Sequence, residues 1–301
     1  MSFRITEAAT NARLTAQITT SRQRLADAQD HLSSGRRINR LSDDPGGASA
    51  VFQLRTTQTQ LEQFVKNADS TKDALLVGDI TLDSYQQLLD RARVLLTNAG
   101  TSAFYDKARV PVATELEGII TRIQQLANTE YHDSYLFGGT RLTAPPYDIN
   151  GVPATTATTE VSVQIEPEGT LIARGVTAES FLADANGTIV DALKTAATAI
   201  RGTGNETADK ATVLATIDRV KGFADLASQS RTKIGERLAH LDQVTERLKQ
   251  YNLSLEDSAQ RIEVIDIAKA AIEVKEADTA LNAVLQSASQ FGRRSLLDFL
   301  G

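Results

Sequence analysis

A narrow apolar stripe runs through the first segment of the chain. From Ile5 to Leu32, apolar and small residues recur at alternating intervals of four and three positions, which places them on one face of a helix. The stripe consists of Leu14, Ile18, Ser21, Leu25, Ala28 and Leu32. Because Ser33, Ser34 and Gly35 favour a stop, we predict a helix that ends near residue 32 and offers one thin seam to a partner.

A much longer helix is predicted to follow. Asp43 and Asp44 can cap free N–H groups, and Pro45 suits a first helical position. The chain then runs without proline to about Asn98. A helix of roughly 50 residues would be about 75 Å long, too long for the interior of a compact domain. This segment therefore predicts a rod.

A third helix is predicted from Pro111 to Thr129, with Pro111 in or near its first turn. One face of this helix is apolar. That face carries Leu116, Ile119, Ile120, Ile123 and Leu126. We expect the helix to pack beside the rod.

Residues 138–186 lose helical periodicity and gather Gly, Pro and Thr, which is typical of an inserted unit. Apolar residues alternate with polar ones in one part of it. The alternating apolar residues are Val161, Val163 and Ile165. Glu166-Pro167-Glu168-Gly169 can then reverse the chain into residues 171–174. We predict a small β-hairpin here.

The C-terminal third shows a heptad repeat and contains no proline after Pro167. Its leading positions are Ile234, Leu241, Leu248, Leu255 and Ile262, and its companion positions are Val244, Tyr251, Ser258 and Ile265. Two seams filled over four heptads favour coiled-coil packing. A further amphipathic stretch carries Ile272, Leu281, Val284, Leu285, Ala288 and Phe291, and the chain closes with Leu296-Leu297-Asp298-Phe299-Leu300.

Helical patterns at both ends and an irregular middle predict long antiparallel helices whose termini meet. The fold class is therefore mainly α: a coiled-coil rod with both termini paired, plus a small inserted β-rich domain. We predict a terminal coiled-coil domain (1–44 with 260–301), a helical rod domain (45–140 with 205–259) and a small β-rich outer domain (141–204). Residues 1–42 carry a balance of +4 and residues 262–301 a balance of −2. These opposite signs favour pairing of the ends, although salt weakens the effect.

Composition narrows the class of protein. Hydrophobic residues make up 41% of the chain and aromatic residues only 5%, which suits thin helical seams. A net charge of −6 without a long basic block argues against nucleic-acid binding. The absence of Cys excludes disulfides and thiolate chemistry. Charged residues interrupt the first 30 residues, and no apolar run approaches about 20 residues, so we expect neither a cleaved secretory signal nor membrane insertion.

The sequence offers no constellation for catalysis. Nucleophile-elbow, phosphate-loop and metalloprotease motifs are missing, and the three histidines, His31, His132 and His240, fall on separate predicted segments. We therefore predict no enzyme and no catalytic, cofactor-binding or metal-binding residues. Asp43 and Asp44 could hold a cation, but two carboxylates supply too few ligands and a helix cap is favoured.

The densest basic cluster is Arg36, Arg37 and Arg40. Acidic residues follow it at once and no aromatic residues interleave, so a solvated loop or a subunit contact is a better interpretation than a phosphate site. The heptads leave two alternatives open, because an internal bundle and an assembly interface have the same periodicity.

The residues around the first predicted loop carry a family likeness. Leu32-Ser33-Ser34-Gly35-Arg36-Arg37-Ile38-Asn39, followed by Ser42-Asp43-Asp44-Pro45, resembles the N-terminal signature of bacterial flagellins and their hook-associated relatives. Residues 90–101 and 295–300 look like further segments of that family, and the resemblance covers roughly residues 1–140 and 205–301. Tyr135-Leu136-Phe137-Gly138-Gly139-Thr140, together with Asp44-Pro45, is more similar to the hook-associated branch. Filament flagellin itself is the alternative.

The resemblance implies a structural subunit of the bacterial flagellum. It implies a terminal domain that lines a tube, a rod outside it and a small outer domain. The implied partners are the first hook-associated protein, flagellin, further copies of this chain in a ring, an export chaperone and the flagellar type III export apparatus. The implied location is extracellular, at the junction of hook and filament, without a cleaved signal peptide.

Two sets of residues follow from pattern and resemblance. The predicted subunit-interface seam is Leu14, Ile18, Leu25, Leu32, Ile262, Ile265, Ile272, Leu281, Leu285, Leu296, Leu297 and Phe299. The family-signature residues are Ser34, Gly35, Ile38, Asn39, Asp43, Asp44, Pro45, Tyr135, Leu136, Phe137, Gly138 and Thr140. We expect Tyr135, Leu136 and Phe137 to anchor the insert against the rod.

Overall fold

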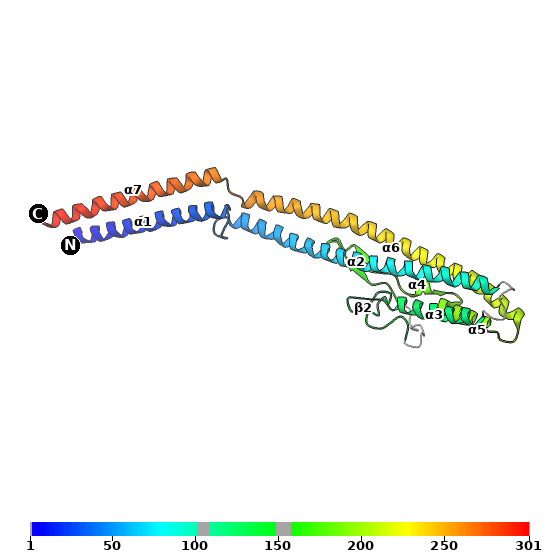
Figure 1. The fold of residues 1–301 in the computed structure, drawn as a ribbon. Helices are drawn as coiled ribbons and strands as arrows, with labels where there is room; N and C mark the ends of the chain where they lie inside the picture. Colours follow the sequence, from blue (N-terminus) through cyan, green and yellow to red (C-terminus); the bar gives the residue numbers. More distant parts are fainter. Residues whose placement is uncertain (1, 101–108, 149–157, 301) are drawn as a thin grey trace. The chain divides into compact units, whose positions relative to one another are not determined.

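The computed structural model describes the backbone of residues 2–100, 109–148 and 158–300, and the side chains of residues 9, 11–100, 109–148 and 158–289. These residues form long helices and a few very short strands (Figure 1). The helices are α1 (Ser2–Ser34), α2 (Pro45–Gly100), α3 (Arg109–Ala127), α4 (Glu179–Leu182), α5 (Ile189–Arg201), α6 (Glu206–Glu263) and α7 (Ile267–Leu300). The predicted mainly helical class, with a small β region, is confirmed.

The strands form three antiparallel pairs of two strands each. They are β1 (Glu130–Tyr131) with β2 (Ser134–Tyr135), β3 (Ser162–Gln164) with β4 (Leu171–Ala173), and β5 (Ala183–Asp184) with β6 (Gly187–Thr188). None of the described helices is long and apolar enough to cross a membrane.

The chain divides into two compact units. Unit 1 comprises Met1–Thr59 and Tyr251–Gly301, and unit 2 comprises Gln60–Gln250. Helices α2 and α6 contribute to both units. The three-part division of the chain made from the sequence remains a prediction.

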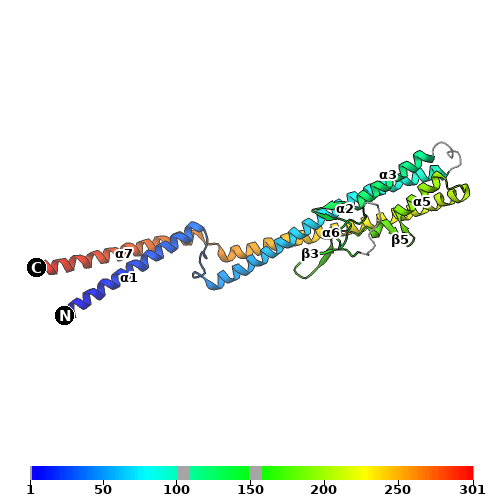
Figure 2. The same ribbon diagram turned by 90° about the horizontal axis from the view of Figure 1, so that it is seen from below.

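Unit 1 is built on two pairs of helical segments. α1 packs along α7, and the two helices run antiparallel (Figures 1 and 2). The predicted pairing of the terminal helices is therefore confirmed. Fully buried apolar side chains in this unit are few among those described: Ile38, Val51, Leu255, Ala259 and Ala270. Tyr251, predicted to occupy a companion heptad position, is instead 50% exposed.

Unit 2 has a continuous heptad core between α2 and α6. Every seventh residue of α2 is buried: Leu61, Ala68, Leu75, Leu82, Leu89 and Leu96. The matching series on α6 is Val213, Val220, Ala227, Ile234, Leu241 and Leu248. Cross-helix ion pairs flank this core, since Lys72 Nζ lies 2.5 Å from Asp242 and Arg231 lies 2.8 Å from Asp79. The predicted coiled-coil packing of the C-terminal third is confirmed over this stretch.

The predicted hairpin is present as β3 and β4, with Val163 opposite Ile172. Gly169 reverses the chain at a φ of +87°, a conformation that favours glycine. Buried Ile165 fixes the hairpin, and Asn67 Nδ2 of α2 donates to the Gln164 carbonyl at 3.2 Å. Glu166 forms an ion pair with Arg247 of α6. The hairpin is thus attached to both long helices.

The insert contains more helix than the sequence analysis assigned to it. Thr188 and Asp191 form a reciprocal capping box that starts α5, and α5 packs against α3 (Figure 2). Its buried apolar face includes Ile189, Leu193, Ala196 and Ile200. The described residues of segment 141–204 therefore combine small hairpins with a buried helix. The bounds of this segment as a separate domain remain a prediction. The composition of the preceding Gly- and Pro-rich stretch concealed this short helical pattern.

Candidate functional site: the terminal helix pair and the signature loop

The seam between α1 and α7 is regular but incompletely covered. Of the predicted α1 residues, Leu14, Ile18, Leu25 and Leu32 are all half-buried along α7. On α7 the least exposed side chains recur at intervals of four and three: Ala270, Val274, Ala277, Leu281, Val284 and Ala288. Only Ala270 among them is fully buried. Two helices alone leave this seam partly open to water.

The structure separates the other predicted seam residues. Ile262 and Ile265 lie half-buried at the end of α6 and in the linker that precedes α7. Ile272 and Leu285 are 59% and 38% exposed, so they lie outside the intrachain seam. Leu296, Leu297 and Phe299 lie outside the residues whose side chains are described. The contact of all these residues with other subunits remains a prediction.

Sequence reasoning missed Ala270, Val274 and Ala277 because small side chains give a weak apolar signal. The alternating intervals of four and three residues, followed backward from Leu281, would have found them. No ion pair joins the described side chains of α1 and α7, which contact one another through apolar and small residues. The terminal pair is therefore held by its seam.

Residues 35–44 form a compact loop, here called the signature loop, that connects α1 to α2. Gly35 adopts a φ of +67°, which a side chain would disfavour. The Arg37 N–H donates to the Glu263 carbonyl at 2.7 Å, and the Ile265 N–H donates to the Gly35 carbonyl at 3.2 Å. The loop is thereby bridged to residues 263–265, which connect α6 to α7. The loop between α1 and α2 and the linker between α6 and α7 therefore form one hydrogen-bonded joint.

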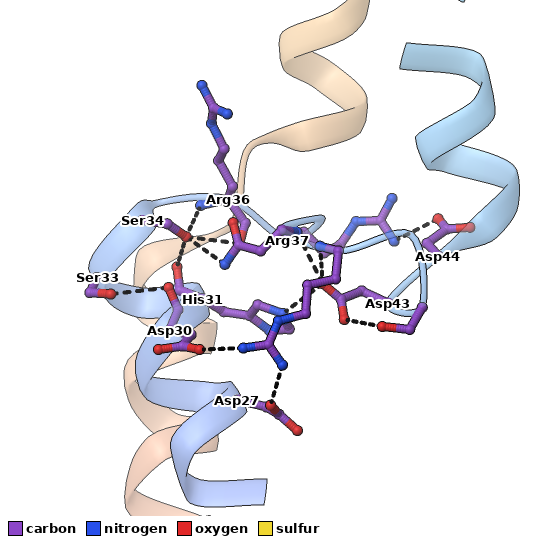
Figure 3. Close-up of polar contacts among 12 residues, drawn as sticks. Asp27, Asp30, His31, Ser33, Ser34, Arg36, Arg37, Asp43 and Asp44 are labelled. Carbon is purple, nitrogen blue, oxygen red and sulfur yellow. Dashed lines mark hydrogen bonds and ion pairs between the residues drawn. The ribbon is translucent and has the colours of Figure 1, made fainter. Parts of the chain in front are cut away.

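Asp43 organises the interior of the signature loop (Figure 3). Its Oδ2 accepts the N–H groups of Arg40 at 2.8 Å and Asn39 at 3.0 Å, and lies 3.5 Å from His31 Nε2 of α1. The Arg40 hydrogen bond, followed by those of Asn39 and His31, lowers the pKa of Asp43. Asn39 Nδ2 in turn donates to Ser34 Oγ at 2.9 Å. The signature residues thus bond mainly to one another.

Asp44 caps α2 as predicted. Its Oδ1 accepts the Gly47 N–H at 2.9 Å, and Pro45 is the first helical residue. Its Oδ2 accepts a bond from Arg37 Nη1 at 3.1 Å (Figure 3). The Gly47 hydrogen bond is the largest of the causes that lower the pKa of Asp44, and Arg37 adds to it. The cap interpretation is confirmed for Asp44, whereas Asp43 accepts backbone N–H groups within the signature loop.

Ile38 closes the end of the core of unit 1. It is 9% exposed, and its position depends on Gly47. A Cβ atom added at Gly47 would lie 2.6 Å from Ile38 Cδ1 and 2.5 Å from Asp44 Oδ2, too close to be accommodated without movement. Because Gly47 has no side chain, the side chains of Ile38 and Asp44 can occupy the space beside it.

The basic cluster forms ion pairs within unit 1. Arg37 Nη2 donates to the Ile262 carbonyl at 3.1 Å, in addition to its bond with Asp44. Arg40 Nη2 lies 3.2 Å from Asp30 of α1. Beside this cluster, Arg55 of α2 lies 2.8 Å from Glu263 of α6. The interpretation of a solvated loop agrees with these contacts, in which Arg37 connects the loop to α6 and Arg40 connects it to α1.

A second set of signature residues lies in unit 2. Phe137 is 1% exposed, and its ring packs edge-on against Phe181 of α4 at 5.0 Å. Phe181 in turn packs against Tyr85 of α2 at 5.3 Å, and the Tyr85 hydroxyl donates to the Phe181 carbonyl. Burial raises the pKa of Tyr85 well above its usual range. Phe137 therefore anchors the insert to the rod, as expected.

Close backbone packing leaves no room for a side chain at Gly138 and Gly139, the two residues after Phe137. A Cβ atom at Gly138 would lie 2.4 Å from the Arg141 carbonyl oxygen, and one at Gly139 would lie 2.6 Å from that of Thr159. Thr140 donates its N–H to the same Thr159 carbonyl at 3.0 Å.

The described residues contain no group of three or more His, Asp or Glu side chains placed to hold a metal ion.

The long helices, the paired ends and the signature loop define a mainly helical protein. Residues 5–141 match the family model of the bacterial flagellin N-terminal helical region. The chain is 30% identical to a flagellin of Listeria innocua over 46% of this chain and 45% of that protein. The resemblance that the signature residues predicted is confirmed.

Flagellar hook-associated protein 3 is among the proteins that the chain resembles. The chain is 28% identical to that protein of Salmonella typhimurium over 44% of this chain and 42% of the relative. The chain thus matches less than half the length of these curated relatives. A solved flagellar hook-associated protein of Vibrio parahaemolyticus aligns over 74% of this chain and 100% of its own, with a TM-score of 0.69 and 19% identity. Hook-associated protein 3 of Legionella pneumophila aligns over 70% and 98%, with a TM-score of 0.63 and 11% identity.

Proposed function

We propose that this chain is a structural adaptor subunit of the bacterial flagellum that joins the hook-associated junction to the flagellin filament. The observation that supports this most is the fold, because a solved flagellar hook-associated protein aligns with this chain over its full length. The Phe137 anchor adds support, since Phe137 belongs to the segment that resembles the hook-associated branch. The signature loop resembles flagellins and hook-associated proteins alike.

In this role the terminal pair supplies the assembly surface. Its seam is half-buried in one chain, so neighbouring subunits would complete its burial. A joint between a bending hook and a stiff filament needs one face for each neighbour, and such heterologous contacts add subunits head to tail. The proposed partners are the first hook-associated protein, flagellin and further copies of this chain. An export chaperone and the flagellar type III apparatus would deliver it outside the cell.

A deletion strain tests the proposal. Loss of an adaptor leaves complete hooks, while flagellin is secreted without forming filaments. Electron microscopy of the cells and assay of flagellin in the medium measure this. Long attached filaments on the deletion strain would contradict the adaptor role.

Filament flagellin is the second candidate, favoured by the Listeria match of 30% identity. A filament subunit makes up most of the mass of the filament, whereas an adaptor forms a short ring. Quantitative mass spectrometry of sheared filaments separates the two, because a dominant share for this chain would support flagellin.

The predicted interface residues can be tested in the same strain. Replacing Leu25 or Leu285 by Asp places a carboxylate in the proposed contact, which costs several kcal/mol or forces its protonation. We expect either variant to be secreted but absent from flagella. Normal incorporation of a variant would remove that position from the interface.

A further inference from the structure

The apolar seam of α6 changes its spacing near residue 250. Through Leu241, Val244 and Leu248, the buried side chains follow alternating intervals of three and four residues. The next position in this series is Tyr251, which is 50% exposed, and Asn252 is half-buried in its place. Two intervals of four therefore follow one another. Such a step locally relaxes the supercoil that a strict heptad repeat imposes.

A polar pair lies in the seam at this level. It consists of Gln58 of α2 and Asn252 of α6, both in unit 1, and is here called the polar layer. Gln58 Nε2 donates to the Asn252 main-chain carbonyl at 3.5 Å, which is long for a hydrogen bond. The Asn252 Oδ1 atom is buried and accepts no hydrogen bond from a described residue. A buried amide oxygen without a protein donor weakens the packing of the two helices.

α2 is also weakened at this level by its own side chains. Thr56, Thr57 and Thr59 each donate the hydroxyl to the main-chain carbonyl four residues earlier, at 2.8–3.0 Å. These bonds compete with the helical N–H groups for the same carbonyl oxygens and often bend a helix. Threonine also has a low helix propensity, because its branched side chain loses freedom in a helix. The three threonines beside Gln58 therefore favour a bend in this segment of α2.

We propose that the polar layer is a bending point built into the rod, at which α2 and α6 separate locally and α2 bends. Apolar layers close the seam on both sides of it, and their buried residues are Leu61, Leu248, Val51 and Leu255. Opening is therefore confined to a few residues. The use of this bending point rests on the proposed function, because an adaptor between a bending hook and a stiff filament must itself yield.

Replacing both members of the polar layer by leucine tests the weakness of the seam. The protein with Gln58→Leu and Asn252→Leu loses the unpaired acceptor and gains apolar contacts, so it should resist urea better than the unaltered chain. In the unaltered chain, amides of residues 54–62 and 248–256 should exchange on the order of tenfold faster than those of residues 64–75. The leucine variant should lose this difference.

Spin labels measure the bend itself, because the chain contains no Cys that would react with the label. One protein carries Ser49→Cys with Ser70→Cys, two exposed positions of α2 on either side of the polar layer. The other carries Asp73→Cys with Val94→Cys, exposed positions of the same helix separated by the same three heptads. A straight helix places each pair about 31 Å apart. Pulsed electron paramagnetic resonance should give a broader distance distribution for the first pair, and the leucine variant should narrow it to that of the second.

Gln60→Leu is the matched control. It replaces the same type of residue in the same helix, where the side chain is exposed, so it should change neither amide exchange nor the distance distributions. Three results would overturn the bending point: equal widths for the two labelled pairs of the unaltered chain, a leucine variant that keeps the broad distribution, or a leucine variant that resists urea less well. None of these results bears on the deletion phenotype, so the adaptor function and the bending point can fail separately.

Discussion

The same heptad pattern produces two different degrees of burial in this molecule. In unit 2, Leu75, Leu82 and Leu89 of α2 are fully buried, and α2 contacts α6, α3 and α4 of the insert along this stretch. In the terminal pair, Leu14, Leu25 and Leu281 follow the same spacing but remain half-buried, because the described side chains of α1 and α7 pack chiefly on each other. Periodicity therefore specifies which residues face a partner, and the number of partners decides whether the region is stable alone.

Phe137→Ala should have the largest effect on stability. It removes a fully buried ring from the contact with Phe181 that holds the insert on α2, at a cost of about 3–5 kcal/mol. Urea unfolding followed by circular dichroism measures the loss. Phe52→Ala is the control, since that side chain is 73% exposed and its loss should change stability little. Similar losses for both variants would contradict the anchor role.

A matched pair of Leu→Ala substitutions compares the two regions directly. Leu82→Ala should cost about 2–5 kcal/mol, because it leaves a cavity in a closed core. Leu25→Ala should cost the isolated chain less than about 1 kcal/mol, since the side chain already contacts water. Denaturant titrations of both variants give the comparison, and equal losses would show that the terminal pair is as well packed as unit 2.

Gly47→Ala should weaken the joint by about 1–3 kcal/mol through overpacking. The added methyl group meets Ile38 and Asp44, which must move. Gly235→Ala is a suitable control, because a Cβ there meets nothing and alanine favours helix. Amide exchange at residues 36–44 reports the effect. An unchanged loop in the Gly47 variant would contradict the close contact.

Acid should produce the smallest and most local change. The pKa of Asp43 is lowered in the folded chain from about 3.9, so its stabilising contribution is complete above that value and is lost as pH falls through the lowered pKa. Carboxyl chemical shifts from NMR give the titration directly. Asp43→Asn should remove the pH dependence of the Asn39 and Arg40 amides, and a titration of Asp43 above 3.9 would contradict the assigned hydrogen bonds.

Sequence patterns predicted the helices, caps and turns better than the contacts that these elements make with distant parts of the chain. The caps at Asp44 and the turn at Gly169 were predictable because they depend on local chemistry. The close packing around Gly47 was not predictable, since it depends on the loop placing the Ile38 side chain beside the start of α2. α5 was missed for a similar reason: its Ala-rich face becomes a core only because α3 lies beside it.

The candidate site shows the same limit. The spacing on α1 located its seam, because Leu and Ile give a strong apolar signal. On α7 the pattern did not separate two faces, since Ile272 and Leu285 are exposed while Ala270 and Val274 face α1. The contact of Ile272 and Leu285 with other subunits remains a prediction. A single chain's pattern does not distinguish a face that meets its own partner helix from one that is free for another molecule.

Hydrogen exchange of the isolated chain and of assembled flagella tests the central claim most directly. That claim is that unit 2 is stable alone and that the terminal pair gains its stability from neighbouring subunits. Amides of α1 and α7 should exchange quickly in the isolated chain and become protected in flagella, whereas those of α2 and α6 in unit 2 should be protected in both. Equal protection of α1, α7 and unit 2 in the isolated chain would contradict the account.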